Sequence, residues 1–476
     1  MTRARPVPDL RLLPPVLAGW LAVRFALTRP PTATLAEAGA LAVLGAALLV
    51  RPRRFAPVGA TLLVAAALAA SAALHVYAVR LGPVAALAAA HGRATVRATV
   101  TGDPKPVKEL ILVPIRIDAL TAGDGTGIGV RARATALVRP REPADGIRWS
   151  ALLPSMRVEL AGRLEPPKDP AAGDAATLFA DQVPKILGGP DLVQRLAGAL
   201  RTDLREAVAG LPAEPAGVLP ALTLGDTRAV PAATEEDLRT AGLSYLVVVS
   251  GENLVFLSAA VLPLARQAGV RARALALLAA LLALGFTVLA RPGPPMVRAT
   301  VTALLASVAL ATGRRFRGLT ATAGAALILL LIDPWLAHAY GFVLSVAATA
   351  GLLISAPAWR DRLVVGGRVP HWIATPAAYT AAAEVYCEPL LVTFTGALPL
   401  FSVPANVLAV PAAPPATVLG VAAMAGYAVW PPAGHAAAWL AQWPARWICL
   451  VAHGTARLPG AALPWPNGLA GMLALL

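Results

Sequence analysis

Apolar runs of span length recur along the whole chain and restrict what it can fold into. A helix of about 20 mostly apolar residues crosses the roughly 30 Å hydrocarbon core of a bilayer. Hydrophobic residues make up 57% of the chain and charged residues 14%, which is more apolar surface than one soluble core can bury. Because the runs are continuous and do not alternate, they predict helices rather than strands of a membrane barrel. We therefore expect a polytopic α-helical membrane protein.

A polar interval divides the candidate spans into two groups. The first run follows a basic head like that of a signal peptide, but it lacks a convincing small-residue cleavage site, so we expect an uncleaved anchor. Short apolar pieces at 216–224 and 461–476 are incomplete or re-entrant spans. The complete candidates lie at about 13–29, 37–50 and 57–80, and then at about 243–265, 272–290, 295–312, 319–332, 339–357, 374–397, 402–429 and 433–454.

Arginine clusters beside the runs predict the orientation, because Lys and Arg near span ends are retained on the cytoplasmic side. Their alternation with the spans places the N-terminus inside and the polar interval outside the cytoplasmic membrane. The same clusters can account for the formal net charge of +15 without any nucleic-acid-binding surface. The clusters are Arg3, Arg5 and Arg11; Arg51, Arg53 and Arg54; Arg266, Arg271 and Arg273; Arg314, Arg315 and Arg317; and Arg360, Arg362 and Arg368.

In the polar interval the pattern changes to strict alternation. The stretch VPIRIDALTA places Val113, Ile115 and Ile117 on one face, and VRARATALVR and MRVELAGRL alternate in the same way. These segments predict a small extracytoplasmic β domain over residues 90–168, with at least four strands. An OB-like barrel fits this length, and so does a generic sandwich.

The predicted β domain has a basic balance, with 13 Lys and Arg against 8 Asp and Glu between residues 91 and 168. Trp149 is the only Phe, Tyr or Trp in that range, so stacking on bases is barely available and contacts with a polyanion would go mostly to phosphates. The alternative is ordinary surface charge. Candidate phosphate contacts are Arg93, Arg97, Arg116, Arg131 and Arg133.

The chain thus divides into four parts. Residues 1–85 form a three-span membrane region, and the β domain follows. Residues 169–214 form a connector in which Leu192, Leu196, Leu200, Leu204 and Val208 are spaced as on an amphipathic helix. Residues 215–476 form a multi-span domain.

Polar groups interrupt the run AGLSYLVVVSGENLVFL. One interpretation is a broken helix whose Ser250, Gly251, Glu252 and Asn253 line a hydrated path or contact a ligand. The alternative is close helix packing at the Ser-Gly pair, with the polar groups bonded between helices, although packing explains the charge of Glu252 poorly. Residues expected on one face of this helix are Tyr245, Val249 and Asn253.

Other ionisable groups lie inside or beside predicted spans. Placing a charge there costs free energy, so these groups are functional candidates. Arg298 either snorkels to the membrane surface or faces an anion in the interior. Glu384 and Glu388 are one turn apart and either pair with an Arg or line a path. No nucleotide-binding loop, hydrolase signature, cofactor motif or metal-ligand spacing is present in the sequence, and Cys387 and Cys449 lie in apolar runs.

Five motifs in order resemble the ComEC family of competence proteins, whose members form the inner-membrane channel for transforming DNA. They are LGDTR, AGLSYLVVVSGENLVFL, VRATVTALLA, DPWLAHAYGFVLSVAATAGLL and LFSVPANVLAVPAAPPATVLG. The resemblance implies an OB-like domain outside and a multi-span channel domain. It places on the DNA path the motif residues Asp226, Arg228, Ser250, Gly251, Arg298, Ser345 and Asn406, to which the intramembrane pattern adds Tyr245, Glu252 and Asn253.

The chain also departs from the family pattern. Tyr245 and Asn253 stand where many members have histidines, so no proton or metal role of those histidines is expected here. Many members carry a C-terminal metallo-β-lactamase-like domain, whose His-x-His-x-Asp-His signature is missing from this sequence. We therefore expect a form without that domain, whether naturally short or cut at Leu476, and no nuclease activity.

The function that the resemblance implies is passive import of single-stranded DNA through the cytoplasmic membrane. The implied partners are membrane lipid, a DNA receptor and uptake pilus outside, and an ATP-driven translocase in the cytoplasm. A secondary transporter of a small anionic or lipid-linked substrate is the alternative, because it too would use broken helices and intramembrane charge. A membrane scaffold without transport activity is a third hypothesis.

Overall fold

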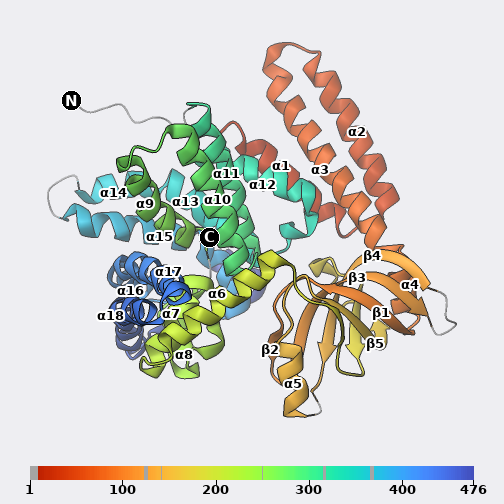
Figure 1. The fold of residues 1–476 in the computed structure, drawn as a ribbon. Coiled ribbons are helices and arrows are strands. Elements are labelled where there is room, and N and C mark those ends of the chain that lie inside the picture. Colours follow the sequence, from red (N-terminus) through yellow and green to blue (C-terminus); the bar gives the residue numbers. More distant parts are fainter. Residues whose placement is uncertain are drawn as a thin grey trace. The chain divides into compact units, whose positions relative to one another are not determined.

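The computed structural model describes residues 9–122, 127–140, 142–248, 250–314, 318–364 and 369–475. Two compact units are present (Figure 1). One comprises residues 13–198 and 327–339, and we call it the barrel unit. The other comprises residues 1–12, 199–326 and 340–476, and we call it the helical unit. Outside the described residues lie Val249 of the predicted helix face and, from the orientation clusters, Arg3, Arg5, Arg315, Arg317 and Arg368.

The barrel unit begins with helices and continues into a sheet. Its helices are α1 (Leu13–Ala26), α2 (Pro31–Leu49), the 3-10 turn η1 (Arg53–Phe55), α3 (Ala56–Arg80), α4 (Pro83–Ala89), α5 (Pro143–Ser150) and η2 (Pro170–Ala172). Its strands are β1 (Arg93–Val100), β2 (Lys105–Val107), β3 (Leu110–Ala122), β4 (Gly127–Val138), β5 (Arg157–Glu165), β6 (Ala176–Ala180) and β7 (Lys185–Gly188). The turn η5 (Pro334–Ala337), far along the chain, also belongs to this unit.

The sheet closes into a five-stranded barrel. Its strand order is β1-β3-β4-β6-β5, and β5 pairs back with β1. Strands β4 and β6 run parallel, with Thr135 opposite Thr177, while the other pairs are antiparallel. Helix α5 connects the third barrel strand to the fourth. This is the Greek-key arrangement of an OB fold, so the predicted OB-like domain is confirmed.

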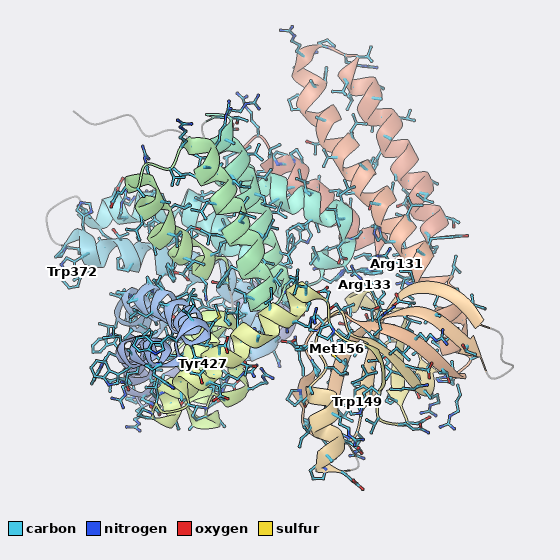
Figure 2. All side chains as sticks on the ribbon, in the orientation of Figure 1. Arg131, Arg133, Trp149, Met156, Trp372 and Tyr427 are labelled. Atoms are coloured by element: carbon cyan, nitrogen blue, oxygen red, sulfur yellow. The ribbon has the colours of Figure 1, made fainter. Side chains whose placement is uncertain are left out.

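Alternation along the strands builds the barrel interior. Val113, Ile115 and Ile117, predicted to share one face, are all buried in the core. Trp149 of α5, labelled in Figure 2, is buried in the same core. The barrel unit extends past Lys168, because β6 completes the barrel and β7 pairs with β5. These two strands are only 5 and 4 residues long and are bounded by Gly, Pro and Asp, so their alternation is too brief to stand out in the sequence.

The helical unit contains the remaining helices, although the helix Gly318–Ile332 ends in the barrel unit from Leu327 onward. They are α6 (Leu192–Val208), which begins in the barrel unit, α7 (Ala213–Leu224), η3 (Thr227–Ala229), α8 (Ala232–Thr240), η4 (Ser244–Val247), α9 (Gly251–Gln267), α10 (Ala272–Ala290), α11 (Pro294–Ala311), α12 (Gly318–Ile332), α13 (Tyr340–Ile354), α14 (Ala356–Val364), α15 (His371–Thr395), α16 (Ser402–Ala409), η6 (Val410–Ala412), α17 (Ala413–Val429), α18 (Pro431–Ala456) and α19 (Gly468–Leu475). Two short strands, β8 (Ala397–Pro399) and β9 (Ala462–Pro464), pair antiparallel.

Five helical segments in the described residues are long and apolar enough to cross a membrane. A sixth is possible if the pair α13 and α14, bent by 41°, counts as one span. The other predicted spans are shorter or more polar: α12 has 15 residues, and α15 carries two glutamates. The five segments are Pro31–Leu49, Arg53–Arg80, Ala272–Ala290, Pro294–Ala311 and Ser402–Val429.

The predicted amphipathic connector is helix α6, and its two halves differ. Leu192 and Leu196 are exposed, whereas Leu204 and Val208 are buried in the core of the helical unit. That core also takes in α7, whose residues from Gly217 to Leu224 are all buried. The apolar piece at 216–224 is therefore a packed core helix.

Candidate functional site

The site begins where α9 starts. The candidate span over 243–265 is a broken helix, as one interpretation of its polar interruption expected: the 3-10 turn η4 ends at Val247, and α9 begins only at Gly251. Ser250 caps α9, because its Oγ accepts a hydrogen bond from the backbone N of Glu252 at 3.2 Å. Glu252 therefore lies in the first turn of a helix, where the helix dipole favours a negative charge.

Asn253 and Gly251 fix this helix start against two neighbours. The Nδ2 of Asn253 donates to the backbone carbonyl of Leu222, at the end of α7, over 2.6 Å. A Cβ at Gly251 would lie 2.6 Å from the Cβ of Ala299 on α11. Only glycine therefore allows α9 and α11 to approach this closely.

Arg298 lies beside this contact and is only 7% exposed. Its Nε donates to Ser345 Oγ of α13 at 2.9 Å. Within the part of the chain that the structure describes, no carboxylate lies within ion-pair distance of Arg298. A buried guanidinium without a counter-ion is costly, so this position is suited to meeting an anion.

A second polar contact joins η4 to α16. The hydroxyl of Tyr245 donates to Asn406 Oδ1 at 2.6 Å, and Asn406 Nδ2 donates to the carbonyl of Ser402 at 2.9 Å. Tyr245 and Asn253 do not share a helix face as predicted, because η4 and α9 are separate elements. Each instead ties the α9 start region to a different helix.

Two glutamates of α15 adjoin this second contact. Glu384 lies beside Ser402 and Asn406, and Glu388 follows one turn later. One carboxylate oxygen of each is buried and has no hydrogen-bond partner among the described residues. Their spacing of four residues was visible in the sequence, but nothing in it indicated which helix they would face.

Asp226 and Arg228 form a separate cluster. Asp226 is 7% exposed and accepts hydrogen bonds from both Nε and NH2 of Arg228, each at 2.7 Å, and from Arg205 Nε at 3.0 Å. Arg201, also buried, lies 3.8 Å away. Burial alone would raise the pKa of Asp226, but the bonded guanidinium of Arg228, with Arg201 and Arg205, holds that pKa well below its ordinary value. This cluster joins α6 to the turn after α7.

The five candidate arginines of the barrel are arranged on β1, β3 and β4 (Arg131 and Arg133 are labelled in Figure 2). On the outer face Arg116 is the cross-strand partner of Arg133. Arg131 has no ion-pair partner among the described residues, whereas the other four do. The pairs are Arg93–Asp181 at 3.0 Å, Arg97–Glu159 at 3.5 Å, Arg116–Asp118 at 2.8 Å and Arg133–Asp333 at 2.8 Å.

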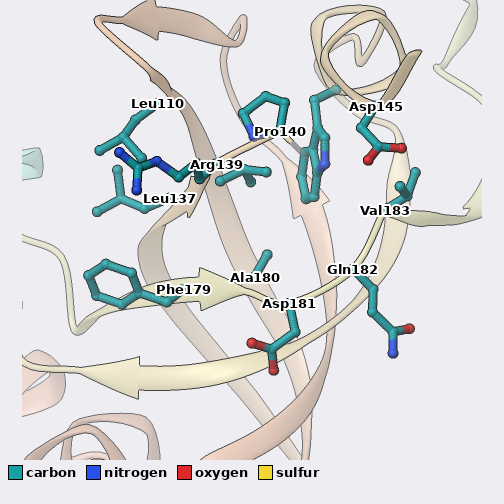
Figure 3. A pocket seen from close by; sticks show the side chains of 12 residues that line it. Leu110, Leu137, Arg139, Pro140, Asp145, Phe179, Ala180, Asp181, Gln182 and Val183 are labelled. Carbon is teal, nitrogen blue, oxygen red and sulfur yellow. The ribbon is translucent and has the colours of Figure 1, made fainter. Parts of the chain in front are cut away.

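A groove of about 720 Å³ opens at one end of the barrel (Figure 3). The ring of Phe179 and the side chains of Arg139, Asp181 and Gln182 line it. Lys168 Nζ lies 5.9 Å from the centre of the Phe179 ring. Phe179 is thus an aromatic residue of the barrel that lies beyond the predicted boundary at Lys168. Among the described residues no group of three or more His, Cys, Asp or Glu could hold a metal ion.

Comparison with known proteins identifies the segment that contains the polar contacts around α9. The family model described as Competence protein matches residues 222–476, more than half of the chain. The matched range begins at Leu222, the residue that accepts from Asn253, and it includes Tyr245, Arg298 and Asn406. No curated protein and no solved structure matches the chain.

Proposed function

The chain belongs to the competence protein family, and we propose that it forms a passive conduit for single-stranded transforming DNA in the cytoplasmic membrane. Its candidate membrane-spanning helices would form the wall of the conduit, and the barrel would stand outside and receive the strand. Membrane lipid would surround the spans.

The observation that carries this proposal is the buried, uncompensated Arg298. A strand of DNA brings a phosphate at every nucleotide, and such an anion would supply the counter-charge that the described residues do not provide. Ser345, which accepts from Arg298, and Ser250, at the start of α9, are neutral. One guanidinium with a neutral hydrogen-bond partner would hold a phosphate weakly enough for the strand to move on.

The arginines of the barrel would bind the incoming DNA strand in a different way from Arg298. Four of the five candidates are paired with carboxylates, but Arg93, Arg97 and Arg133 are more than half exposed in these pairs. Exposed ion pairs contribute little free energy, so a phosphate can replace the carboxylate at low cost. Contact by this route would weaken steeply as the salt concentration rises.

The proposal assigns no nuclease or NTPase chemistry to the chain. The driving force would then come from partners: a DNA receptor and uptake pilus outside, and an ATP-driven translocase in the cytoplasm. Family membership is the support for these partners. No cofactor is required by the proposal.

The test is uptake of labelled DNA by cells in which the chain is deleted and then restored as wild type, Arg298→Gln or Arg298→Lys. We expect deletion to abolish nuclease-protected cytoplasmic DNA. Arg298→Gln should lower it by about tenfold or more, since hydrogen bonds to charged groups are worth ~1.5–3 kcal/mol. Arg298→Lys, which keeps the charge, should retain part of the uptake.

Arg239→Gln is the matched control, because Arg239 lies on α8 in an exposed pair with Glu236. It should leave uptake unchanged when all variants reach the membrane in equal amounts. Undiminished uptake in the deletion strain would refute the conduit. Equal uptake by Arg298→Gln and wild type would remove Arg298 from the path.

A further inference from the structure

The order of strands identifies the ligand face of the barrel. Strands β3 and β4 are the second and third barrel strands, and residues 166–175 connect the fourth strand, β5, to the fifth, β6. OB barrels bind oligonucleotides on the face of their second and third strands, flanked by the connection between the fourth and fifth. In this chain Arg116, Arg131 and Arg133 lie on that face.

A turn of the same unit already covers part of this face. Arg133 donates from NH1 to Asp333 Oδ2 at 2.8 Å. Two residues later, Trp335 is 6% exposed and lies against Gly173 in the connection between β5 and β6. A Cβ at Gly173, where φ is +77°, would lie 2.3 Å from Trp335 Cδ1, so the indole packs directly on the backbone.

The turn is held firmly but its carboxylate is incompletely satisfied. The carbonyl of Ala337 accepts from the indole Nε1 of Trp20 on α1 at 3.2 Å, which anchors the far end of the turn. Asp333 Oδ1, in contrast, is buried and has no hydrogen-bond partner among the described residues. Leaving a buried carboxylate oxygen without a hydrogen bond costs free energy, which lowers the cost of moving Asp333 away from Arg133.

The chemical groups of the turn are those that a nucleotide would present. Asp333 brings an anion to Arg133, as a phosphate would, and Trp335 brings a flat aromatic ring, as a base would. We propose that the Asp333–Ala337 turn is an internal stand-in for a nucleotide, and that single-stranded DNA binds this face of the barrel only by displacing it. This inference rests on the proposed function in taking DNA as the ligand.

Arg131 gives an incoming strand its first contact. It is exposed, lies two residues before Arg133 on the same face of β4, and has no ion-pair partner in the described part of the chain. A phosphate bound at Arg131 places the next part of the strand near the contact between Arg133 and Asp333. Displacement of Asp333 then exchanges one anion for another at Arg133.

The test uses the full chain in lipid nanodiscs and a fluorescent oligothymidylate, with affinity measured by anisotropy at low salt. Asp333→Asn keeps the size of the side chain and removes its charge, so it should bind the oligonucleotide about two- to fivefold more tightly than wild type. The double variant Asp333→Asn, Arg133→Gln should lose this gain. Glu109→Gln removes the exposed partner of Arg139 elsewhere on the barrel and should bind as wild type does.

A second measurement follows the turn itself. Hydrogen–deuterium exchange of residues 333–337 should rise when the oligonucleotide is added to wild type. Unchanged exchange on binding, equal affinities of wild type and Asp333→Asn, or no binding by any variant would each overturn the inference.

If uptake in cells does not need the chain, the proposed function fails while a gain in Asp333→Asn still stands. If uptake needs it but the affinities are equal, only the inference fails.

Discussion

Asp226 shows how one buried carboxylate can organise several segments. Three arginines converge on it, and Arg201 additionally donates from NH1 to the backbone carbonyl of Leu289 on α10 at 2.8 Å. The carboxylate thus balances guanidinium groups that approach from α6 and from the turn after α7. Its removal would take the carboxylate away from the buried guanidinium of Arg201, which costs more than the loss of one hydrogen bond.

We expect Asp226→Asn to lower the free energy of unfolding by about 3–5 kcal/mol, the usual cost of breaking a buried pair. Thermal unfolding of the purified protein in detergent measures the change. Glu236→Gln is the control, since it removes an exposed ion pair with Arg239 and should change stability by no more than about 0.5 kcal/mol. Equal effects of the two substitutions would contradict the central place of Asp226.

The same cluster predicts a pH dependence. The pKa of Asp226 is lower in the folded protein than in the unfolded chain, so its ionised form stabilises the fold above about pH 3.9. That stabilisation is lost only as the pH falls through the lowered pKa. The difference in stability between wild type and Asp226→Asn should therefore stay constant from about pH 8 to about pH 5.

At the scale of single residues, the sequence indicates candidate residues but not what they contact. The sequence indicates Ser250, Gly251 and Arg298 as candidates because they interrupt apolar runs, where polar groups cost free energy and are therefore rare without a function. Their partners Ala299 and Ser345 lie on α11 and α13, and only folding brings them to the start of α9. The charge of Glu252, which helix packing could not explain, follows from its place in the first turn of α9.

The contact between α9 and α11 is the element-scale feature most sensitive to substitution. Gly251→Ala should lower the free energy of unfolding by about 1–3 kcal/mol, because the added Cβ would overlap that of Ala299. The double variant Gly251→Ala, Ala299→Gly moves the space to the other helix and should recover most of the loss. Thermal unfolding in detergent compares the two.

Gly285→Ala in α10 controls for the general effect of adding a methyl group to a helix. No atom lies within 4 Å of a Cβ at that position, so stability should change by less than about 0.5 kcal/mol. If the double variant were no more stable than Gly251→Ala alone, close approach of α9 and α11 would not be the reason for glycine at 251.

Elements with long patterns were predicted correctly, and short ones were not. The alternation through β3 predicted its inward face, and the apolar runs predicted α2, α3, α10 and α11. Strands β6 and β7 were missed because a few residues cannot establish a period. The candidate span at 243–265 is broken at the residues that the sequence indicated, because Ser250 and Gly251 start a helix instead of continuing one.

Two contacts between distant segments constrain the topology of the whole molecule. In the helical unit, β8 pairs with β9, so the segment after α15 and the segment after α18 lie side by side. In the barrel unit, the pair between Arg133 and Asp333 brings the residue that follows α12 to the barrel. The hydrophobic pattern of a single run predicts neither contact, because each contact joins segments that are far apart in the sequence.

These constraints and the arginine clusters together predict which exposed positions share a side. We expect single cysteines at Ile147 on the barrel and at Leu400 after β8 to react with a membrane-impermeant maleimide on intact cells. A cysteine at Val50, beside Arg51, should react only after the membrane is opened. The three side chains are 71%, 48% and 90% exposed, so access does not limit labelling.

The background for this experiment is the chain with Cys387 and Cys449 replaced by alanine, so that each variant carries one thiol. Labelling of Val50 together with Ile147 on intact cells would show that the hairpin of α2 and α3 does not cross the membrane. Labelling of Ile147 without Leu400 would instead separate the barrel from the β8–β9 pair. In that case the chain would cross the membrane an odd number of times between residues 147 and 400, whereas the arginine clusters require an even number. This result would not affect the pairing of β8 with β9.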